Sequence, residues 1–175
     1  MLELYQFPHS PFCLKVRMAL QAKKLNYKII NITPGVGQIK IFRLSGQKQV
    51  PLVLDEENII FDSSAIIRYL DNKYFKNKLI PKNAQDATQV NLIEDWADTT
   101  LAKACRTELV KTASIDKELL CALLPNDMPS GIKKLARNCS FGVLNELTNF
   151  IHQEGSSNLL ANLEKISSLL KQRKW

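Results

Sequence analysis

The four residues Ser10-Pro11-Phe12-Cys13 are the first place in the chain where residue types and spacing suggest chemistry. Ser is a preferred N-cap residue and Pro is preferred at the first helical position, so this motif predicts the start of a helix. The unpaired N–H groups and the positive dipole end of such a helix lower the pKa of a thiol held there. Two interpretations follow: a capped helix without chemistry, or a helix end where the Ser10 hydroxyl donates a hydrogen bond to a thiolate.

The same motif looks like a redox Cys-x-x-Cys site whose leading sulfur has been replaced by the Ser10 oxygen. Cys13 has no second thiol within the motif, so it cannot close a disulfide there. A redox role requires Cys13 to be exposed and to have a low pKa. Its place inside the first helical turn favours burial instead, which is our expectation.

Two later motifs have binding chemistry. Pro51 at the start of a strand lacks a ladder donor. A cis Val50–Pro51 bond would expose the backbone of Val50 to a peptide-like ligand, although only about 5–6% of X–Pro bonds are cis.

Asp62 and Ser63 precede an apolar helical stretch and are ordinary capping residues. The same helix start also suits a carboxylate, while Asp62 suits an amino group, so one site could take both ends of an amino acid.

The elements that must position these motifs alternate between strand and helix over the first eighty residues. Period-two or β-branched patterns predict strands at 2–7, 27–32, 50–55 and 58–61. Apolar residues at helical spacing predict helices from residue 12, at 38–44 and at 63–74. The order βαβαββα indicates a small α/β domain at 1–76.

After residue 81 the pattern is helical throughout. Apolar spacing predicts helices at 86–111, 116–124, 129–153 and 158–171, with no strand signal. We therefore expect a linker at 77–85, followed by an all-α domain at 86–175.

Composition limits the class of protein. The 175 residues are 45% hydrophobic and 23% charged, which is ordinary for a globular chain and excludes collagen-like and disordered classes. No apolar run approaches the ~20 residues that span a bilayer, and the strand-like start does not resemble a signal peptide. We expect a soluble, cytoplasmic protein without membrane partners.

The distribution of charge and the spacing of the cysteines limit the classes of ligand that we expect. Residues 1–80 contain 12 Lys and Arg against 6 Asp and Glu, which suits a small anionic ligand. The basic residues are scattered singly, so nucleic-acid binding is disfavoured. Cys105, Cys121 and Cys139 are too widely spaced for a zinc cluster, so we expect reduced thiols and no metal.

Taken in order, the motifs resemble those of the glutathione transferases. The likeness is carried by Tyr5-Gln6-Phe7, Ser10-Pro11-Phe12-Cys13, Gln49-Val50-Pro51-Leu52 and Asp62-Ser63-Ser64-Ala65-Ile66. Residues 33–38 and 42–47 look most like the cyanobacterial, serine-type members. The resemblance is specific over about residues 2–75 and architectural beyond them.

This resemblance implies a thioredoxin-like domain, a cis Pro51 and a homodimer. It implies that Ser10 stabilises the thiolate of glutathione, the co-substrate, for conjugation to an apolar electrophile in detoxification. Val50 would pair its backbone with the cysteinyl part of glutathione, and Asp62 and Ser63 would hold the γ-glutamyl part. Gln49 stands where a Lys is frequent in the family, next to the glycyl carboxylate.

The helical half departs from the family pattern. Relatives usually have a helix that starts with Ser/Thr-x-x-Asp, whereas the nearest candidate here, Ser167-Ser168-Leu169-Leu170, ends in Leu. A shortened helical domain favours a second hypothesis, a non-catalytic glutathione-binding or protein-interaction module. A third hypothesis is a glutathione-dependent thiol reductase that works through Cys13.

Overall fold

The computed structural model describes residues 1–33, 36–124, 130–138 and 159–171. The chain divides into two compact units, Met1–Val90 and Asn91–Trp175. The segment 77–85 groups with the first unit in this division. The domain boundaries expected from the sequence, 1–76 and 86–175, remain predictions.

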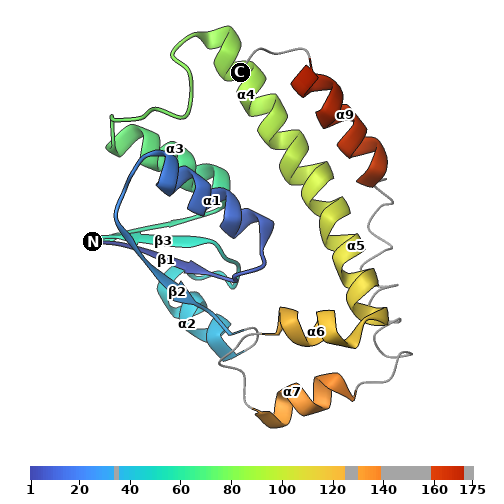
Figure 1. Cartoon of the computed structure of the whole chain (residues 1–175). Helices are drawn as coiled ribbons and strands as arrows, with labels where there is room; N and C mark the ends of the chain where they lie inside the picture. Colours follow the sequence, from blue (N-terminus) through green and yellow to red (C-terminus); the bar gives the residue numbers. More distant parts are fainter. Residues whose placement is uncertain (34–35, 125–129, 139–158, 172–175) are drawn as a thin grey trace. The chain divides into compact units, whose positions relative to one another are not determined.

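A four-stranded mixed sheet forms the centre of the first unit (Figure 1). Strand β1 (Leu2–Gln6) pairs in parallel with β2 (Tyr27–Asn31) and antiparallel with β3 (Leu52–Asp55). Strand β4 (Asn58–Phe61) pairs antiparallel with β3, which gives the order β2-β1-β3-β4.

Helices cover both faces of this sheet, because successive strand residues point to opposite sides. On one face, Leu4 and Val53 pack against α1 (Pro11–Ala22) and α3 (Ser63–Lys73). On the other face, buried side chains of β1 and β3 pack against Ile41 of α2 (Val36–Ser45). The predicted order βαβαββα and the α/β thioredoxin-like fold are therefore confirmed.

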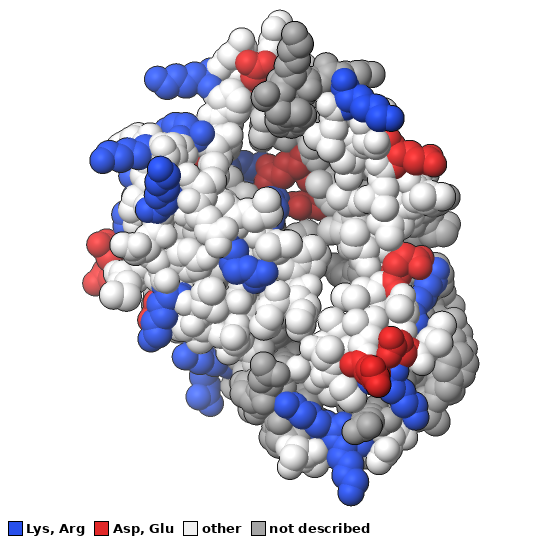
Figure 2. All heavy atoms as spheres, in the orientation of Figure 1, with Lys and Arg blue, Asp and Glu red and all other residues white. Residues whose placement is uncertain are grey.

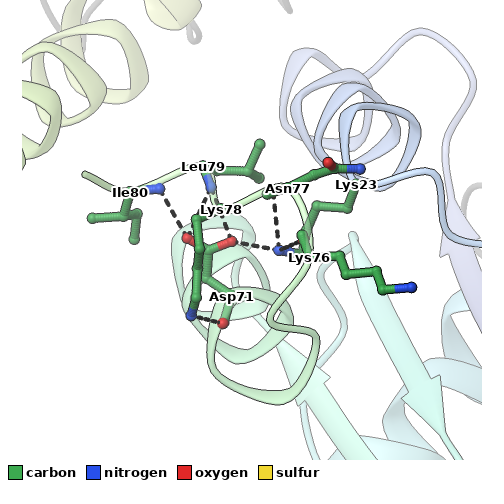
Figure 3. A network of polar contacts seen from close by, with 7 residues as sticks. All are labelled: Lys23, Asp71, Lys76, Asn77, Lys78, Leu79 and Ile80. Atoms are coloured by element: carbon green, nitrogen blue, oxygen red, sulfur yellow. Dashed lines mark hydrogen bonds and ion pairs between the residues drawn. The ribbon is translucent and has the colours of Figure 1, made fainter. Parts of the chain in front are cut away.

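A buried ion pair ties the end of α3 to the chain that follows it (Figure 3). The Asp71 carboxylate accepts hydrogen bonds from Lys23 Nζ at 2.7 Å and from the amides of Leu79 at 3.1 Å and Ile80 at 2.8 Å. Both charged side chains are almost fully buried. The network is completed by bonds from Lys23 Nζ to the carbonyls of Lys76 and Asn77, and from Lys78 Nζ to the carbonyl of Asp71. Residues 76–80 are thereby fixed to the first unit.

The described part of the second unit is helical. Helix α4 (Ala84–Trp96) runs across the boundary between the units and continues through a π-helix (Ala97–Leu101) into α5 (Ala102–Ile115). The sequence predicted one helix over 86–111. The structure instead has a π-helical interruption within this stretch, where the hydrogen bonds run from residue i to residue i+5.

Three further helices follow in the part of the chain that the structure describes. They are α6 (Lys117–Leu123), α7 (Ser130–Arg137) and α9 (Leu159–Lys171). Most of the predicted helix at 129–153 lies outside the described residues. Among the residues that are described, no helix is both long enough and apolar enough to cross a bilayer.

Candidate functional site

The start of α1 is built as the sequence predicts. Ser10 is extended, and its Oγ accepts a hydrogen bond from the amide of Cys13 at 3.4 Å, with Pro11 as the first helical residue. The Ser10 amide donates to the carbonyl of Phe7 at 3.2 Å, which closes the turn between β1 and α1. The Ser10 oxygen is thus an acceptor in the cap, and its hydroxyl proton can still be donated to a ligand.

Cys13 is fully buried, as expected. Burial raises the pKa of its thiol, and this outweighs the opposing effects of the Ser10 hydroxyl, the Phe7 backbone and the Arg17 charge. At neutral pH Cys13 is therefore a thiol, shielded from solvent. These are the opposite of the conditions that a redox cysteine requires.

The start of α3 presents a second set of polar groups. Asp62 Oδ1 accepts a hydrogen bond from the Ala65 amide at 3.0 Å and so caps the helix. Asp62 has a φ of 70°, in the left-handed region that is uncommon for a residue other than glycine. Its side chain is exposed and the next residue, Ser63, is buried. In the described residues no hydrogen bond uses Asp62 Oδ2, which leaves this oxygen available to a ligand.

The Val50–Pro51 bond is cis. The family resemblance implied this isomer, whereas the sequence alone made trans the default. Pro51 is buried and Val50 is half-buried. Within the described chain, neither the amide nor the carbonyl of Val50 takes part in a hydrogen bond.

The loop before Pro51 is held by its own side chains. Gln47 Nε2 donates to the Gln49 carbonyl at 2.8 Å, and the Gln49 amide donates back to Gln47 Oε1 at 2.6 Å. Gln38 Nε2, on α2, donates to the Lys48 carbonyl at 3.1 Å. These bonds fix the backbone that leads into the cis peptide.

One pocket of about 160 Å³ brings the loop and the start of α3 together. This volume is below the roughly 300–1,000 Å³ of pockets that enclose a whole small molecule, so it suits one part of a larger ligand. The pocket is lined by Phe12, Gln47, Gln49, Val50, Pro51, Phe61, Asp62 and Ser63.

All five residues predicted from the sequence as glutathione-binding line this pocket, and the two predicted catalytic residues, Ser10 and Cys13, do not. Sequence reasoning missed three lining residues. Phe12 lies within the Ser10–Cys13 motif and Phe61 directly precedes Asp62, so their positions were a usable signal. Gln47 lies in the stretch 42–47 noted for its resemblance, but its place in the pocket depends on the fold of the loop.

The pocket combines apolar walls with polar groups of both kinds. Phe12, Phe61 and Val50 supply apolar surface, while Ser63 can donate and Asp62 can accept hydrogen bonds. Figure 2 shows Lys and Arg side chains spread over the visible surface of the first unit, with fewer acidic ones between them. This excess of positive charge favours an anionic ligand.

Comparison with known proteins identifies the domain that contains this pocket. Residues 4–78 match the family model described as "Glutathione S-transferase, N-terminal domain". This segment is similar to the N-terminal domain of glutathione S-transferases. It includes every residue that lines the pocket.

Curated glutathione S-transferases are similar in sequence to part of this chain. Glutathione S-transferase Z2 of Arabidopsis thaliana is 36% identical over 85 residues, which cover 47% of this chain and 38% of the relative. Glutathione S-transferase D7 of Drosophila melanogaster is 34% identical over 96 residues, which cover 51% and 42%. The chain thus matches about two fifths of the length of these relatives. The predicted likeness to cyanobacterial members is not shown by them.

Solved structures share the fold. Isozyme E7 of the Drosophila melanogaster glutathione S-transferase has a TM-score of 0.55 and 28% identity, covering 61% of this chain and 51% of that one. A beta-etherase from Sphingobium sp. has a TM-score of 0.66 over 99% of this chain and 75% of its own, at 16% identity. At that identity the likeness concerns the fold alone.

Proposed function

We propose that this protein is a glutathione transferase, which binds glutathione at the pocket and activates its thiol for conjugation to an apolar electrophile. The observation that carries the proposal is the convergence of Gln49, Val50, Pro51, Asp62 and Ser63 on one pocket within a segment similar to the N-terminal domain of glutathione S-transferases.

The γ-glutamyl end of glutathione fits the start of α3. The first N–H groups of a helix have no intrahelical acceptor, and with the Ser63 hydroxyl they suit the α-carboxylate. Asp62 Oδ2 suits the α-ammonium group. The backbone of Val50, which makes no hydrogen bond within the described chain, suits the cysteinyl amide.

We propose that the thiol is activated at the start of α1. Phe12 belongs both to the pocket and to the first turn of α1, so a ligand that extends past Phe12 reaches the helix start where Ser10 lies. The Ser10 hydroxyl and the helix dipole would both favour a thiolate. A thiol pKa lowered by about 2 units corresponds to about 2.7 kcal/mol of preference for the ionised form.

The test is calorimetric titration with reduced glutathione. Asp62→Asn keeps a capping oxygen and a side chain that tolerates positive φ, but removes the negative charge. We expect it to weaken binding roughly tenfold, as a charge-assisted hydrogen bond is lost. Glu57→Gln, in the exposed turn between β3 and β4, is the matched control and should bind like the wild type. A folded wild-type protein that does not bind glutathione would contradict the proposal.

A second candidate is a non-catalytic glutathione-binding module. It is favoured by the capping role of the Ser10 oxygen and by the absence of Ser10 from the pocket lining. Saturable glutathione binding without conjugation of an aryl halide activated by nitro groups would select it. A thiol reductase through Cys13 has no comparable support, since that thiol is buried.

Three broader features belong to the same proposal. The resemblance implies a homodimer and a role in detoxification, and the sequence composition favours a cytoplasmic location. Sedimentation velocity of the purified chain tests the first of these, and a single species near 20 kDa would contradict it.

A further inference from the structure

Arg17 of α1 reaches back toward the chain that precedes its own helix. Its Nη2 donates a hydrogen bond to the carbonyl of Pro8 at 3.2 Å, and its Nη1 donates to Gln6 Oε1 at 2.5 Å. Side chains on a helix tilt toward its N-terminus, which allows this contact from nearly two turns away. Arg17 therefore bridges the end of β1 and the turn that carries Ser10.

The groups that Arg17 contacts are themselves fixed. Gln6 is only 4% exposed, its Nε2 donates to Asn31 Oδ1 at 3.0 Å, and its carbonyl accepts from the Ile32 amide at 2.8 Å. The turn itself is closed by the bond from the Ser10 amide to the Phe7 carbonyl. The guanidinium thus fastens residues 7–10 to the ends of β1 and β2.

The charge of Arg17 also acts at the start of α1. It lowers the pKa of the Cys13 thiol, although burial has the larger, opposite effect. Arg does not lose its proton in proteins, so this positive charge is constant across the working pH range. Besides Arg17, the ionisable groups of β1, of the turn and of α1 are Glu3, Tyr5, His9, Cys13 and Lys15.

We propose that Arg17 is a positioning residue for thiol activation: it holds the turn that presents the Ser10 hydroxyl and adds a fixed positive charge that favours the thiolate of bound glutathione. Arg17 does not line the pocket. It therefore acts on ionisation of the thiol and leaves the affinity for the rest of the ligand nearly unchanged. The inference rests on the proposed function, since it needs a glutathione thiol at the start of α1.

Two measurements separate these effects. Ultraviolet absorbance of the thiolate, followed against pH at saturating glutathione, gives the pKa of the bound thiol. Calorimetry with S-methylglutathione, which has no ionisable thiol, gives the affinity for the remainder of the ligand. A purely structural role for Arg17 would weaken S-methylglutathione binding, whereas a role in activation moves the thiol pKa.

For Arg17→Met we expect the pKa of the bound thiol to rise by about one unit, which is about tenfold less thiolate below that pKa. The dissociation constant for S-methylglutathione should stay within roughly twofold of the wild type, a change of under about 0.5 kcal/mol. Arg17→Lys keeps the charge but loses the planar two-pronged contact, so its bound-thiol pKa should lie between those of the wild type and Arg17→Met. Arg68→Met removes one exposed positive charge from α3 and should match the wild type.

The outcomes are distinguishable. A wild-type thiol pKa in both Arg17 variants overturns the inference and leaves the proposed function intact. Strongly weakened S-methylglutathione binding by folded Arg17→Met also overturns it, in favour of a structural role. If Arg17→Met does not fold, Arg17→Lys decides: a raised thiol pKa supports the inference and an unchanged one overturns it. A wild-type protein that binds no glutathione removes the proposed function and the inference together.

Discussion

Ser10 illustrates how one side chain can satisfy a structural and a chemical demand at once. Its oxygen accepts the hydrogen bond from the Cys13 amide, and a hydroxyl that accepts one bond still has a proton to donate. Cys13, three residues further on, lies inside the first turn and is fully buried, and burial raises the pKa of its thiol. At this scale, access to the ligand decides which of the two residues can take part in chemistry.

Replacing Ser10 tests this directly. Ser10→Ala removes both the cap and the donor, so we expect a loss of about 1 kcal/mol in the free energy of unfolding. We also expect conjugation to slow by roughly tenfold to a hundredfold at neutral pH. Ser10→Thr keeps the hydroxyl and is the control. Steady-state kinetics and urea unfolding measure the two effects, and unchanged turnover in Ser10→Ala would remove Ser10 from the mechanism.

At the scale of elements, two buried carboxylates hold the framework around the pocket. Asp55, at the end of β3, accepts hydrogen bonds from the hydroxyls of Tyr69 and Tyr74 at 2.9 and 2.8 Å and pairs with Lys73 Nζ at 2.8 Å. Asp71, near the end of α3, pairs with Lys23 and binds the following backbone. The first ties the hairpin of β3 and β4 to α3, and the second ties α3 to residues 76–80. Together they fix the helix whose start lines the pocket.

The pair Lys23–Asp71 leads to a prediction about stability. Asp71→Asn leaves the buried ammonium of Lys23 without its counter-charge, which costs about 3–5 kcal/mol. We expect urea unfolding to show a loss of this order. Lys28, whose side chain is 62% exposed and pairs with Glu3, provides the control, and Lys28→Gln should cost under about 1 kcal/mol. Equal losses in the two variants would show that the Lys23–Asp71 network does not have the stabilising role assigned to it.

The same two carboxylates predict how the free energy of unfolding depends on pH. Burial alone would raise the pKa values of Asp55 and Asp71, but hydrogen bonds from lysines, tyrosine hydroxyls and backbone amides outweigh it and hold both pKa values below normal. A lowered carboxyl pKa contributes stability that is complete above the unfolded value of about 3.9 and is lost as the pH falls further. The free energy of unfolding should therefore fall steeply below about pH 4.

Asp71→Asn provides the comparison for this pH dependence. Because the variant has one carboxylate fewer to protonate, its unfolding free energy should depend less on pH over the same acid range. At alkaline pH, Tyr74 is a second probe of the network around Asp55, since burial and its bond to Asp55 raise the pKa of Tyr74 to about 12. Parallel stability curves for Asp71→Asn and the wild type would contradict a lowered Asp71 pKa.

At the scale of the whole molecule, every described residue assigned to the site lies in the first unit. If the proposed function holds, ligand binding stabilises the first unit directly. Glutathione at 100 times its dissociation constant should raise the free energy of unfolding of that unit by about 2.7 kcal/mol. Amide hydrogen exchange should show the added protection within residues 1–90. Protection confined to residues 91–175 would place the ligand elsewhere.

The sequence by itself determined the order of strands and helices in the first unit and the two capped helix starts, whereas the grouping of the five pocket residues came from the family resemblance. Period-two and helical spacing act locally, and Ser10-Pro11 and Asp62-Ser63 have capping preferences that need no tertiary context. The cis Val50–Pro51 bond was available only through the family resemblance, because local preference favours trans.

Tertiary structure alone decided the rest. The π-helix at Ala97–Leu101 interrupts a pattern that reads as one continuous helix, because local spacing cannot reveal where packing inserts a residue. The pairing of Lys23 with Asp71 joins residues 48 positions apart, and the link from Arg17 to the turn before its helix depends on where β1 ends. Contacts of this kind are absent from any local pattern, since they form only when the strands and helices pack and bury the charges between them.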